Sequence, residues 1–431
     1  MAELEKSRWE EEEPGAYPMD SGERAILVGL AHGRFGRVEA ETSLAELREL
    51  VLSAGAVPVE TVLQERPAPD PAYFIGRGKV AELLDRVLAL NADLVVFDDE
   101  LMPAQQRNLE EELGVKVVDR SGLILDIFAQ RARSREGKLQ VELALLEYTL
   151  PRLTGRGREL SRLGGGIGTR GPGETQLESD RRIIRRRITN IRRELEQLEQ
   201  RRALQRAKRQ GVPLPVVSLA GYTNAGKSTL FNRLTGVRQV VSPRMFATLD
   251  PLVRRVSLPS GQEVLLSDTV GFIRKLPHAL VAAFHATLEE TVEADLLLHV
   301  IDASDPTWPQ YRRTVYEVLE EVGAAHVPIL EVYNKRDQWR EGGVELPPGA
   351  VAISALTGEG VDELLDVLEE RVSCGYRTVT LVVPYARGEL LPEVRERGRV
   401  EQVEYAPEGV RVTAALRAAD LGRFRDFVVT G

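Results

Sequence analysis

The eight residues at 221–228, GYTNAGKS, have the types and the spacing of a phosphate-binding loop. Glycines let backbone N–H groups face phosphates, and Lys227 can reach the β and γ oxygens of a nucleotide. The hydroxyl of Ser228 would ligate Mg²⁺. An apolar run precedes the loop and a helical pattern follows it, and this context favours a nucleotide site over a strand-to-helix turn without a ligand.

A second motif, NKRD at 334–337, predicts that the base is guanine. The Asp337 carboxylate would accept hydrogen bonds from guanine N1–H and the 2-amino group, and adenine lacks both donors. Asn334 would meet the N7 side, and the SAL sequence at 354–356 would present a backbone N–H to guanine O6. NKRD alone is a common surface tetrapeptide, but its position about 110 residues after the phosphate loop, with SAL downstream, favours base recognition.

The sequence DTVG at 268–271 supplies the groups expected beside Mg²⁺ and the γ-phosphate. Asp268 would lie on the Mg²⁺ side, and the Gly271 N–H would contact the γ-phosphate. Thr248 is the only Thr between Thr235 and Asp268, so it is the expected switch residue that ligates Mg²⁺ when the γ-phosphate is present.

These motifs define three sets of candidate residues. The nucleotide-binding candidates are Gly221, Tyr222, Thr223, Asn224, Ala225, Gly226, Lys227, Ser228, Thr229, Asp268, Gly271, Asn334, Lys335, Asp337, Ser354, Ala355 and Leu356. The catalytic candidates are Lys227, Thr248 and Gly271, and the metal candidates are Ser228, Thr248 and Asp268.

The residue after Gly271 is Phe272, where many GTPases carry a Gln that orients the attacking water. Phenylalanine cannot hydrogen-bond water, so intrinsic hydrolysis should be slow and stimulated by a partner or by reorganised switch loops. Packing is a compatible role for this side chain. As a hypothesis, Asn224 helps to hold a monovalent cation such as K⁺ beside the phosphates; equal GTPase rates in K⁺ and Na⁺ at one ionic strength would contradict it.

Alternating apolar runs and helical patterns predict the elements that position these residues. Strands are expected from Ala25, Val57, Asp93 and Val115, with helices between them that close near Gly or Asn. Further strands are expected around the nucleotide motifs, as VVSLA, EVLLSD, LLLHVID, PILEVYN and AVAIS. The last segment predicts strands at TVTLVVP, VEQVEYA and GVRVTAAL and a helix near 388–397.

Between the two α/β regions the pattern predicts a basic helical hairpin. The glycine-rich stretch 154–176 should be a loop. A helix without Gly or Pro should follow, with a narrow apolar stripe typical of a hairpin or short coiled coil at Ile183, Ile184, Ile188, Ile191, Leu195 and Leu198.

The predicted fold class is therefore α/β: a P-loop GTPase domain with a mostly parallel, doubly wound sheet, a smaller α/β domain with a long helical hairpin before it, and a small α+β domain after it. The expected boundaries are 1–22 for a disordered acidic tail, 23–120, 121–211 for the hairpin, 212–373 for the GTPase domain and 374–431.

Charge is spread unevenly along the chain. The formal net charge is -9, yet residues 131–210 hold 21 Lys and Arg against 10 Asp and Glu, which suits contact with a polyphosphate. One Cys and five His exclude an intramolecular disulfide and give no cluster with metal-ligand spacing. No apolar run approaches the roughly 18 residues of a membrane span, and the acidic start is no signal peptide. We expect a cytoplasmic monomer.

The sequence resembles the HflX family of translation-factor-related GTPases over nearly its whole length. The resemblance rests on FIGRGKV at 74–80, LGGGIGTRGPGETQLE at 163–178, the basic helix after it, FATLD at 246–250, and DTVGFI with its Phe272. It implies a GTPase, with GTP and GDP as substrate and product, that binds the large ribosomal subunit near the peptidyl-transferase region of its 23S RNA. It further implies that the protein dissociates stalled or idle ribosomes, often under stress.

A basic segment with a flexible glycine loop agrees with insertion among RNA phosphates, because Gly permits close approach and Arg makes bidentate contacts. A solvated coiled-coil face is the alternative for these arginines. The RNA-binding candidates are Arg156, Arg158, Arg162, Arg170, Arg181, Arg182, Arg185, Arg186 and Arg187.

Two other functions stay open. The sequence GRGK at 76–79 invites a second nucleotide site, although its spacing favours a turn. Members of the family have been reported to bind ATP through the N-terminal part, so an RNA-remodelling NTPase with a second ATP site is one alternative. A GTPase of ribosome biogenesis or RNA modification is the other, although no cysteine cluster, methyltransferase signature or hydrophobic anchor supports it.

Overall fold

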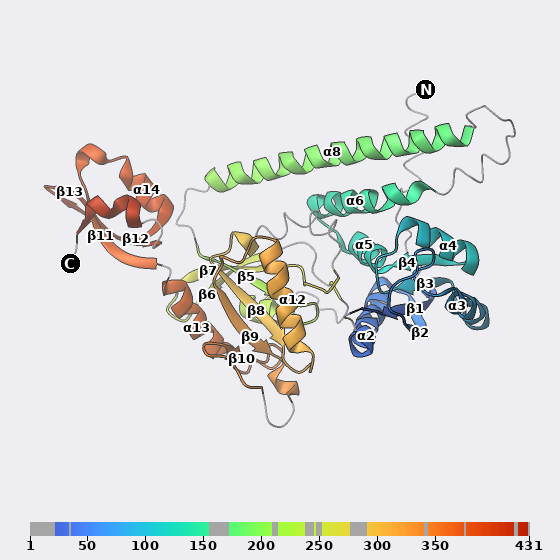
Figure 1. The fold of residues 1–431 in the computed structure, drawn as a ribbon. Helices are drawn as coiled ribbons and strands as arrows, with labels where there is room; N and C mark the ends of the chain where they lie inside the picture. Colours follow the sequence, from blue (N-terminus) through green and yellow to red (C-terminus); the bar gives the residue numbers. More distant parts are fainter. Residues whose placement is uncertain are drawn as a thin grey trace. The chain divides into compact units, whose positions relative to one another are not determined.

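A computed structural model of the protein describes residues 22–33, 36–154, 172–208, 214–237, 245–246, 252–275, 291–339, 344–374, 376–417 and 421–429. These residues form two compact units. The first holds the described residues up to Leu198 together with Met245, Phe246 and Lys275, and the second holds the others. One sheet lies in the first unit and two lie in the second (Figure 1).

A parallel sheet forms the centre of the first unit. Its strands lie in the order β2-β1-β3-β4, with β1 at Arg24–Ala31, β2 at Val57–Glu65, β3 at Leu94–Phe97 and β4 at Lys116–Asp119. The connecting helices are α2 (Arg37–Ala54), α3 (Arg77–Leu90) and α4 (Pro103–Leu113). Gly55 and Asn91 close α2 and α3 in the left-handed conformation, with φ of 98° and 45°. The predicted strands, helices and helix ends of this region are confirmed.

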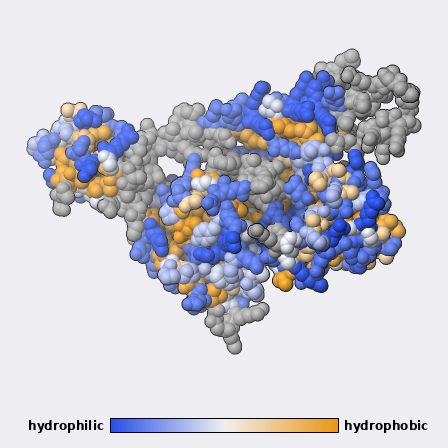
Figure 2. Space-filling view, in the orientation of Figure 1, coloured by the Kyte–Doolittle hydropathy of each residue, from blue (hydrophilic) through white to orange (hydrophobic). Residues whose placement is uncertain are grey.

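A helical hairpin follows this sheet. It consists of α5 (Arg120–Arg131), α6 (Arg135–Thr149), the short helix η1 (Leu150–Thr154) and the long α8 (Pro172–Lys208). Ile188 and Ile191 of α8 pack on three leucines of α6, Leu139, Leu143 and Leu146. Figure 2 shows hydrophobic residues along the side of α8 next to α6 and hydrophilic residues on its outer side. The predicted hairpin is confirmed.

Two details of the predicted hairpin are wrong. Ile183, assigned to the apolar stripe, is 42% exposed. Its neighbour Ile184 packs on the cluster instead, because adjacent helical positions point about 100° apart. The predicted loop is also too long, because α8 begins at Pro172, where proline is compatible with the first helical turn.

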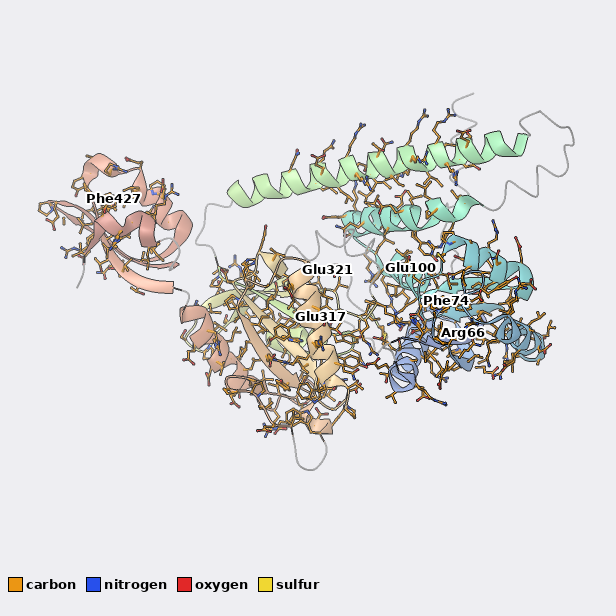
Figure 3. All side chains as sticks on the ribbon, in the orientation of Figure 1. Arg66, Phe74, Glu100, Glu317, Glu321 and Phe427 are labelled. Carbon is orange, nitrogen blue, oxygen red and sulfur yellow. The ribbon has the colours of Figure 1, made fainter. Side chains whose placement is uncertain are left out.

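The GRGK turn at 76–79 lies at the start of α3. Just before it, Phe74 packs edge-to-face on Phe97, with ring centroids 6.1 Å apart, and Figure 3 shows its place in the first unit. The Gly76 N–H donates to Gln64 Oε1 at 2.9 Å. Lys79 Nζ pairs with Glu82 at 2.6 Å. Protein groups therefore occupy two of the donors that a second phosphate site would use, which supports a turn.

A buried ion-pair cluster lies between α2, β3 and α5. Arg120, which is 1% exposed, donates to Glu46 at 2.6 Å and to Asp98 at 2.8 Å. Lys275 Nζ lies 2.6 Å from carboxylate oxygens of both Asp98 and Asp99. In the described part of this cluster, two cations pair with three carboxylates. These pairs compensate the cost of burying charged side chains, which would be too high for an isolated charge.

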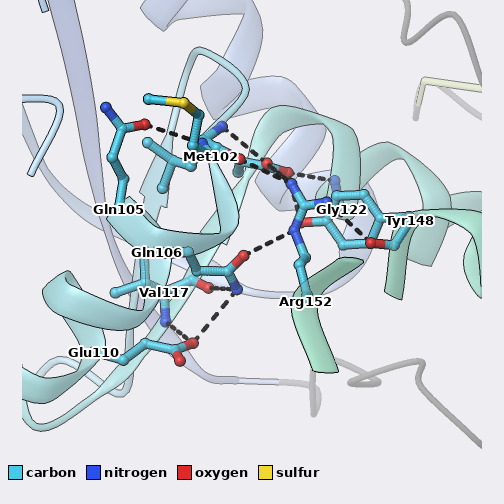
Figure 4. A network of polar contacts seen from close by, with 10 residues as sticks. Met102, Gln105, Gln106, Glu110, Val117, Gly122, Tyr148 and Arg152 are labelled. Carbon is cyan, nitrogen blue, oxygen red and sulfur yellow. Dashed lines mark hydrogen bonds and ion pairs between the residues drawn. The ribbon is translucent and has the colours of Figure 1, made fainter. Parts of the chain in front are cut away.

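A second polar network joins β4 to the hairpin (Figure 4). Asp119, fully buried at the end of β4, accepts hydrogen bonds from Gly122 N, Tyr148 Oη and Arg152, all at 2.8–2.9 Å. The Gly122 bond caps the N-terminus of α5. Burial, and next the Asp119 carboxylate, hold the pKa of the Tyr148 hydroxyl well above its usual range. The hydroxyl therefore stays a donor and ties the hairpin to the sheet.

Two short segments from later in the chain also belong to the first unit. Met245 N donates to Ser53 Oγ at 2.9 Å, and the Phe246 ring packs on Phe128 with centroids 4.6 Å apart. Lys275 is the described residue of the other segment, and it contacts the carboxylates of Asp98 and Asp99. The sequence assigns all three to the GTPase domain, and the other domain boundaries stay predictions.

The main sheet of the second unit has the strand order β10-β9-β8-β5-β7-β6. Its strands are β5 (Val216–Gly221), β6 (Leu252–Ser257), β7 (Glu263–Asp268), β8 (Leu296–Asp302), β9 (Ile329–Asn334) and β10 (Val351–Ala352). All neighbours are parallel except β6 and β7, and α9 (Lys227–Thr235), α12 (Trp308–Glu321) and α13 (Val361–Cys374) follow β5, β8 and β10. The predicted mostly parallel sheet is confirmed.

The strand β6 was not predicted. Val256 is the one buried residue of β6, because β6 is an edge strand, so no apolar run marks it in the sequence. The last sheet, with order β12-β13-β11-β14, is antiparallel where its pairings are described, and it carries α14 (Leu390–Arg397). Its strands are β11 (Tyr376–Val383), β12 (Gly398–Ala406), β13 (Gly409–Arg417) and β14 (Val428–Val429). The predicted small α+β region is confirmed.

Among the described residues, no helix combines the length and the apolar character that a membrane span requires.

Candidate functional site

The predicted phosphate loop runs from the end of β5 to the start of α9. Gly221 and Gly226 have φ of 152° and 95°, which disfavour residues with a side chain. A Cβ at Gly221 would collide with the Val300 carbonyl oxygen, and one at Gly226 with the Asn334 side-chain amide. Both glycines are therefore required by the close approach of neighbouring strands as well as by the loop conformation.

Lys227 lies buried inside this loop. Its Nζ donates to the carbonyl oxygens of Gly221 at 3.0 Å and Tyr222 at 2.7 Å, and the residue is 6% exposed. Burial lowers the pKa of Lys227 to about 8, and the Asp268 carboxylate opposes that shift. The amine is thus held at a fixed point, where an added phosphate would raise its pKa and further favour the charged form.

The two described metal candidates lie together. Ser228 Oγ donates to Asp268 Oδ2 at 2.8 Å, and Asp268 is fully buried at the end of β7. A hydroxyl and a carboxylate at one point are oxygen ligands of the kind Mg²⁺ takes alongside nucleotide phosphates. The neighbouring Thr229 lies in the first turn of α9. Thr248 lies outside the described residues, so its role stays a prediction.

Asn334 connects the phosphate loop to the guanine loop. Its Nδ2 donates to the Ala225 carbonyl at 2.8 Å, and its Oδ1 accepts from Ala355 N at 2.9 Å. The side chain is 2% exposed. These bonds give Asn334 a structural function that the sequence motif did not reveal, and the expected contact with guanine N7 stays a prediction.

Asp337 and Ser354 lie side by side at the predicted base site. Ser354 Oγ donates to Asp337 Oδ1 at 2.5 Å, while the Asp337 side chain is exposed. Lys335 has φ of 59° and pairs with Asp302 at 2.5 Å, which fixes its side chain. A carboxylate oriented by a neighbouring hydroxyl and open to ligand can read two adjacent donors on a base.

Arg233 is a site residue that the sequence did not indicate. It belongs to the last turn of α9, and its Nε donates to the Ala355 carbonyl at 2.7 Å. A second donor meets the Leu356 carbonyl, and Leu356 itself is 67% exposed. Arg233 therefore fixes the SAL loop from the phosphate-loop helix across more than a hundred residues of sequence, a pairing without a local sequence signal.

The DTVG segment lies directly against the phosphate loop. Thr223 N donates to the Phe272 carbonyl at 2.8 Å, and Phe272 N donates to the Gly221 carbonyl at 3.1 Å. A Cβ on Gly271 would lie 3.0 Å from Thr223 Cα and 3.1 Å from Lys227 Nζ. Phe272 is 3% exposed, so its ring packs in the interior, as one of its two predicted roles requires.

A tyrosine pair supports this junction from α12. The rings of Tyr222 and Tyr311 stack with centroids 4.2 Å apart and an interplanar angle of 17°. Tyr222 Oη accepts a hydrogen bond from Arg274 N at 2.9 Å, and the Arg274 guanidinium lies 5.5 Å from the Tyr311 ring centroid. The residues that follow Phe272 are thus held to the phosphate loop by side chains as well as by backbone.

The basic candidates divide into three groups. Arg156, Arg158, Arg162 and Arg170 lie outside the described residues. Arg187 makes a bidentate ion pair with Glu142 of α6, at 2.6 and 2.7 Å, so it joins the two helices of the hairpin, and its contact with RNA stays a prediction. Arg181 also lies on α8, and Arg182, Arg185 and Arg186 share a surface groove with Arg193. Their charge gives this part of α8 a basic surface.

A buried histidine lies on β8, the strand that pairs with β5. His299 is 1% exposed and its ring meets Tyr316 edge-on, with centroids 5.4 Å apart. Burial lowers the pKa of His299 to about 3, although the neighbouring Glu331 opposes the shift. Arg312 and Tyr316 of α12 each donate to Glu331, at 2.6 and 2.7 Å. The imidazole therefore stays neutral in the folded protein at physiological pH.

This depressed pKa predicts an acid-sensitive fold. The unfolded chain binds a proton at His299 below about pH 6.5 and the folded chain does not, so the unfolding free energy should fall as pH decreases, by up to about 1.4 kcal/mol per pH unit. Urea unfolding between pH 6.5 and 5 should show this slope, and His299→Gln should reduce it by about one proton. The matched variant His326→Gln, at an exposed histidine, should retain the slope. An unchanged slope in His299→Gln contradicts the assignment.

Comparison with known proteins gives consecutive family matches along the chain. They are "GTP-binding GTPase N-terminal" at 41–129, "GTP-binding GTPase Middle Region" at 131–209, "50S ribosome-binding GTPase" at 216–335 and "HflX C-terminal domain" at 344–423. The third match contains the phosphate loop, the DTVG segment and Asn334. The fourth contains Ser354 and Ala355.

Relatives of similar length match nearly the whole chain. The chain is 48% identical to GTPase HflX of Caldanaerobacter subterraneus over 95% of its own length and 94% of that protein. It is 46% identical to GTPase HflX of Escherichia coli over 92% of its length and 94% of that protein. A crystal structure of a GTP-binding protein from Sulfolobus solfataricus with GDP is 26% identical, with a TM-score of 0.43, over 82% of this chain and 99% of that one.

Proposed function

Since the chain belongs to the HflX family and is a GTPase, we propose that it is a cytoplasmic GTPase that binds the large ribosomal subunit and its 23S RNA. We propose further that it dissociates stalled or idle ribosomes and that GTP hydrolysis resets the cycle. The family match over nearly the full length, which includes the region described as a 50S ribosome-binding GTPase, is the observation that carries this proposal.

In the proposed site, five of the described candidates have assigned chemical roles. Lys227 contacts the β- and γ-phosphates, Gly271 N–H contacts the γ-phosphate, and Asp337 reads guanine. Ser228 and Asp268 would hold Mg²⁺, and Thr248 would be a further ligand when the γ-phosphate is present. The chemistry supplied by the bound ion would be neutralisation of charge on the phosphate oxygens.

The monovalent cation at Asn224 remains part of the proposal. Asn224 is exposed and has φ of 61°, a conformation that Asn tolerates better than most residues. A side chain presented on the outer surface of the phosphate loop is available to a cation beside the phosphates.

GTP is proposed to order the switch segments and to favour the ribosome-bound form. Sedimentation with purified large subunits, with and without a non-hydrolysable GTP analogue, tests this directly. Binding that is equally weak in both conditions contradicts the proposal. If the analogue also supports splitting, nucleotide binding rather than hydrolysis drives dissociation. Competition of ATP against labelled GTP distinguishes the alternative of an ATP-driven RNA remodeller.

The basic surface of α8 gives a sharper prediction. Replacing Arg182, Arg185 and Arg186 with Ala should weaken large-subunit binding about tenfold or more and lower the salt slope of log K by about three, if each arginine neutralises one phosphate. Sedimentation at several salt concentrations measures both quantities. A matched triple variant with the same charge change, at the exposed Arg313, Arg411 and Arg423, should bind as the wild type does. Equal losses in the two triple variants would show that only net charge matters.

A further inference from the structure

The hydroxyl of Thr223 is a buried polar group in the phosphate loop. Thr223 is 7% exposed, and its Oγ1 has no hydrogen-bond partner among the residues that the structure describes. A buried hydroxyl without a partner lowers the stability of the folded state, whereas a methyl group at that position does not. The phosphate loop requires no hydroxyl here for its backbone conformation. The hydroxyl is therefore a candidate to hydrogen-bond a ligand.

The surroundings of Thr223 indicate which part of the ligand it meets. Its backbone N–H is bonded to the Phe272 carbonyl at 2.8 Å. The Cβ position of Gly271 lies 3.0 Å from Thr223 Cα and Cγ2 and 3.1 Å from Lys227 Nζ. Lys227 and the Gly271 N–H are the groups proposed to contact the terminal phosphate. Thr223 therefore lies at the γ end of the phosphate loop, where the chain has phenylalanine in place of a water-orienting glutamine.

We propose that Thr223 Oγ1 hydrogen-bonds the attacking water and so performs the positioning that Phe272 cannot. The water oxygen forms a bond to the γ-phosphorus, and the bond from that phosphorus to the β–γ bridging oxygen breaks. Its electron pair leaves with GDP, and both hydrogens of the water remain with the phosphate product. The threonine is unchanged, and its contribution is orientation. This inference rests on the proposed nucleotide site.

The junction around Thr223 is rigid enough for such a role. The Tyr222 ring stacks on Tyr311, and its hydroxyl accepts from Arg274 N at 2.9 Å. The chain on both sides of the Thr223–Phe272 hydrogen bond is thus fixed by side-chain contacts. A side chain on a backbone fixed in this way has a defined position relative to the phosphate loop.

Thr223→Val tests the inference because it removes the hydroxyl and retains the branched shape. Single-turnover GTP hydrolysis should slow by about tenfold or more. The GDP affinity should stay within about twofold, and the unfolding midpoint should stay equal or rise, because an unpaired buried hydroxyl is lost. Thr223→Ser, which restores the hydroxyl, should recover most of the rate. Thr223→Ala carries the same expectation for the rate and excludes strain from the second methyl group.

Thr291 provides the matched control. It is fully buried and its Oγ1 also lacks a hydrogen-bond partner among the described residues. Thr291 comes shortly before β8, and the start of β8 lies beside the start of β5, where Asp295 N donates to the Val216 carbonyl. The phosphate loop follows the opposite end of β5. Thr291→Val should therefore leave the hydrolysis rate unchanged.

The outcomes separate the inference from the site on which it rests. A wild-type rate in Thr223→Val, while Lys227→Ala loses hydrolysis, overturns the inference and leaves the site intact. An equal loss of GDP affinity and rate in Thr223→Val would make the hydroxyl a binding group and also overturns it. If Lys227→Ala hydrolyses GTP as the wild type does, the proposed site itself is wrong.

Discussion

Asp337→Asn should weaken GDP binding by about 100-fold or more, because an amide donor would face the N1–H and 2-amino donors of guanine. Ser354 Oγ already donates to Asp337 Oδ1 at 2.5 Å, which fixes the plane of the side chain. The variant should instead gain affinity for xanthosine diphosphate, whose 2-oxo group accepts a hydrogen bond from the new amide. Displacement of a fluorescent GDP analogue by each diphosphate measures both effects.

The control for this variant is Asp362→Asn, at an exposed carboxylate in the first turn of α13. It makes the same chemical change away from the base site and should leave both affinities as they are. A uniform loss of all purine diphosphates in Asp337→Asn, without the gain for the xanthine base, would mean that the loop had collapsed. In that case direct reading of the base by Asp337 would be unsupported.

Arg120→Ala should destabilise the first unit by about 3–5 kcal/mol, because it leaves the Glu46 and Asp98 carboxylates buried without their shared cation. Both side chains are at most 4% exposed, so bulk solvent screens their charges little. Lys275 continues to pair with Asp98. Amide hydrogen exchange of β1 and β3 reports the stability of this unit within the full-length protein.

An exposed arginine on the same unit is the comparison. Arg37 pairs with Glu41, and the two side chains are 67% and 53% exposed. Arg37→Ala should change stability far less than Arg120→Ala does, since solvent screens such a pair. If the two variants lose similar stability, the buried cluster contributes no more than a surface ion pair.

Regular elements were predictable where the apolar pattern was strong. The parallel sheets read as apolar runs because both faces of those strands are covered, as in β8, where all but the last residue is buried. The edge strand β6 was missed because solvent covers most of its side chains. Ile183 was misplaced for a related reason, since a stripe of adjacent apolar residues does not reveal which of them faces the partner helix.

The candidate site was predictable in part, because its motifs are local. Lys227 meets the carbonyls of Gly221 and Tyr222, only six and five residues away, so one short segment carries its own geometry. Asn334 differs. Its motif was visible in the sequence. Its bonds to Ala225 and Ala355 span 109 and 21 residues of the chain, so the sequence did not reveal that Asn334 bridges the two loops.

The sequence by itself determined the chemistry of the nucleotide motifs, the family, and the alternation of elements, because each depends on residue types in short consecutive segments. Only the tertiary structure decided that Arg233 holds the SAL loop, that Lys275 pairs with Asp98, and that the Thr223 hydroxyl is left without a described partner. The physical reason is that the burial and pairing of a polar group depend on neighbours brought from distant parts of the chain, which no local pattern specifies.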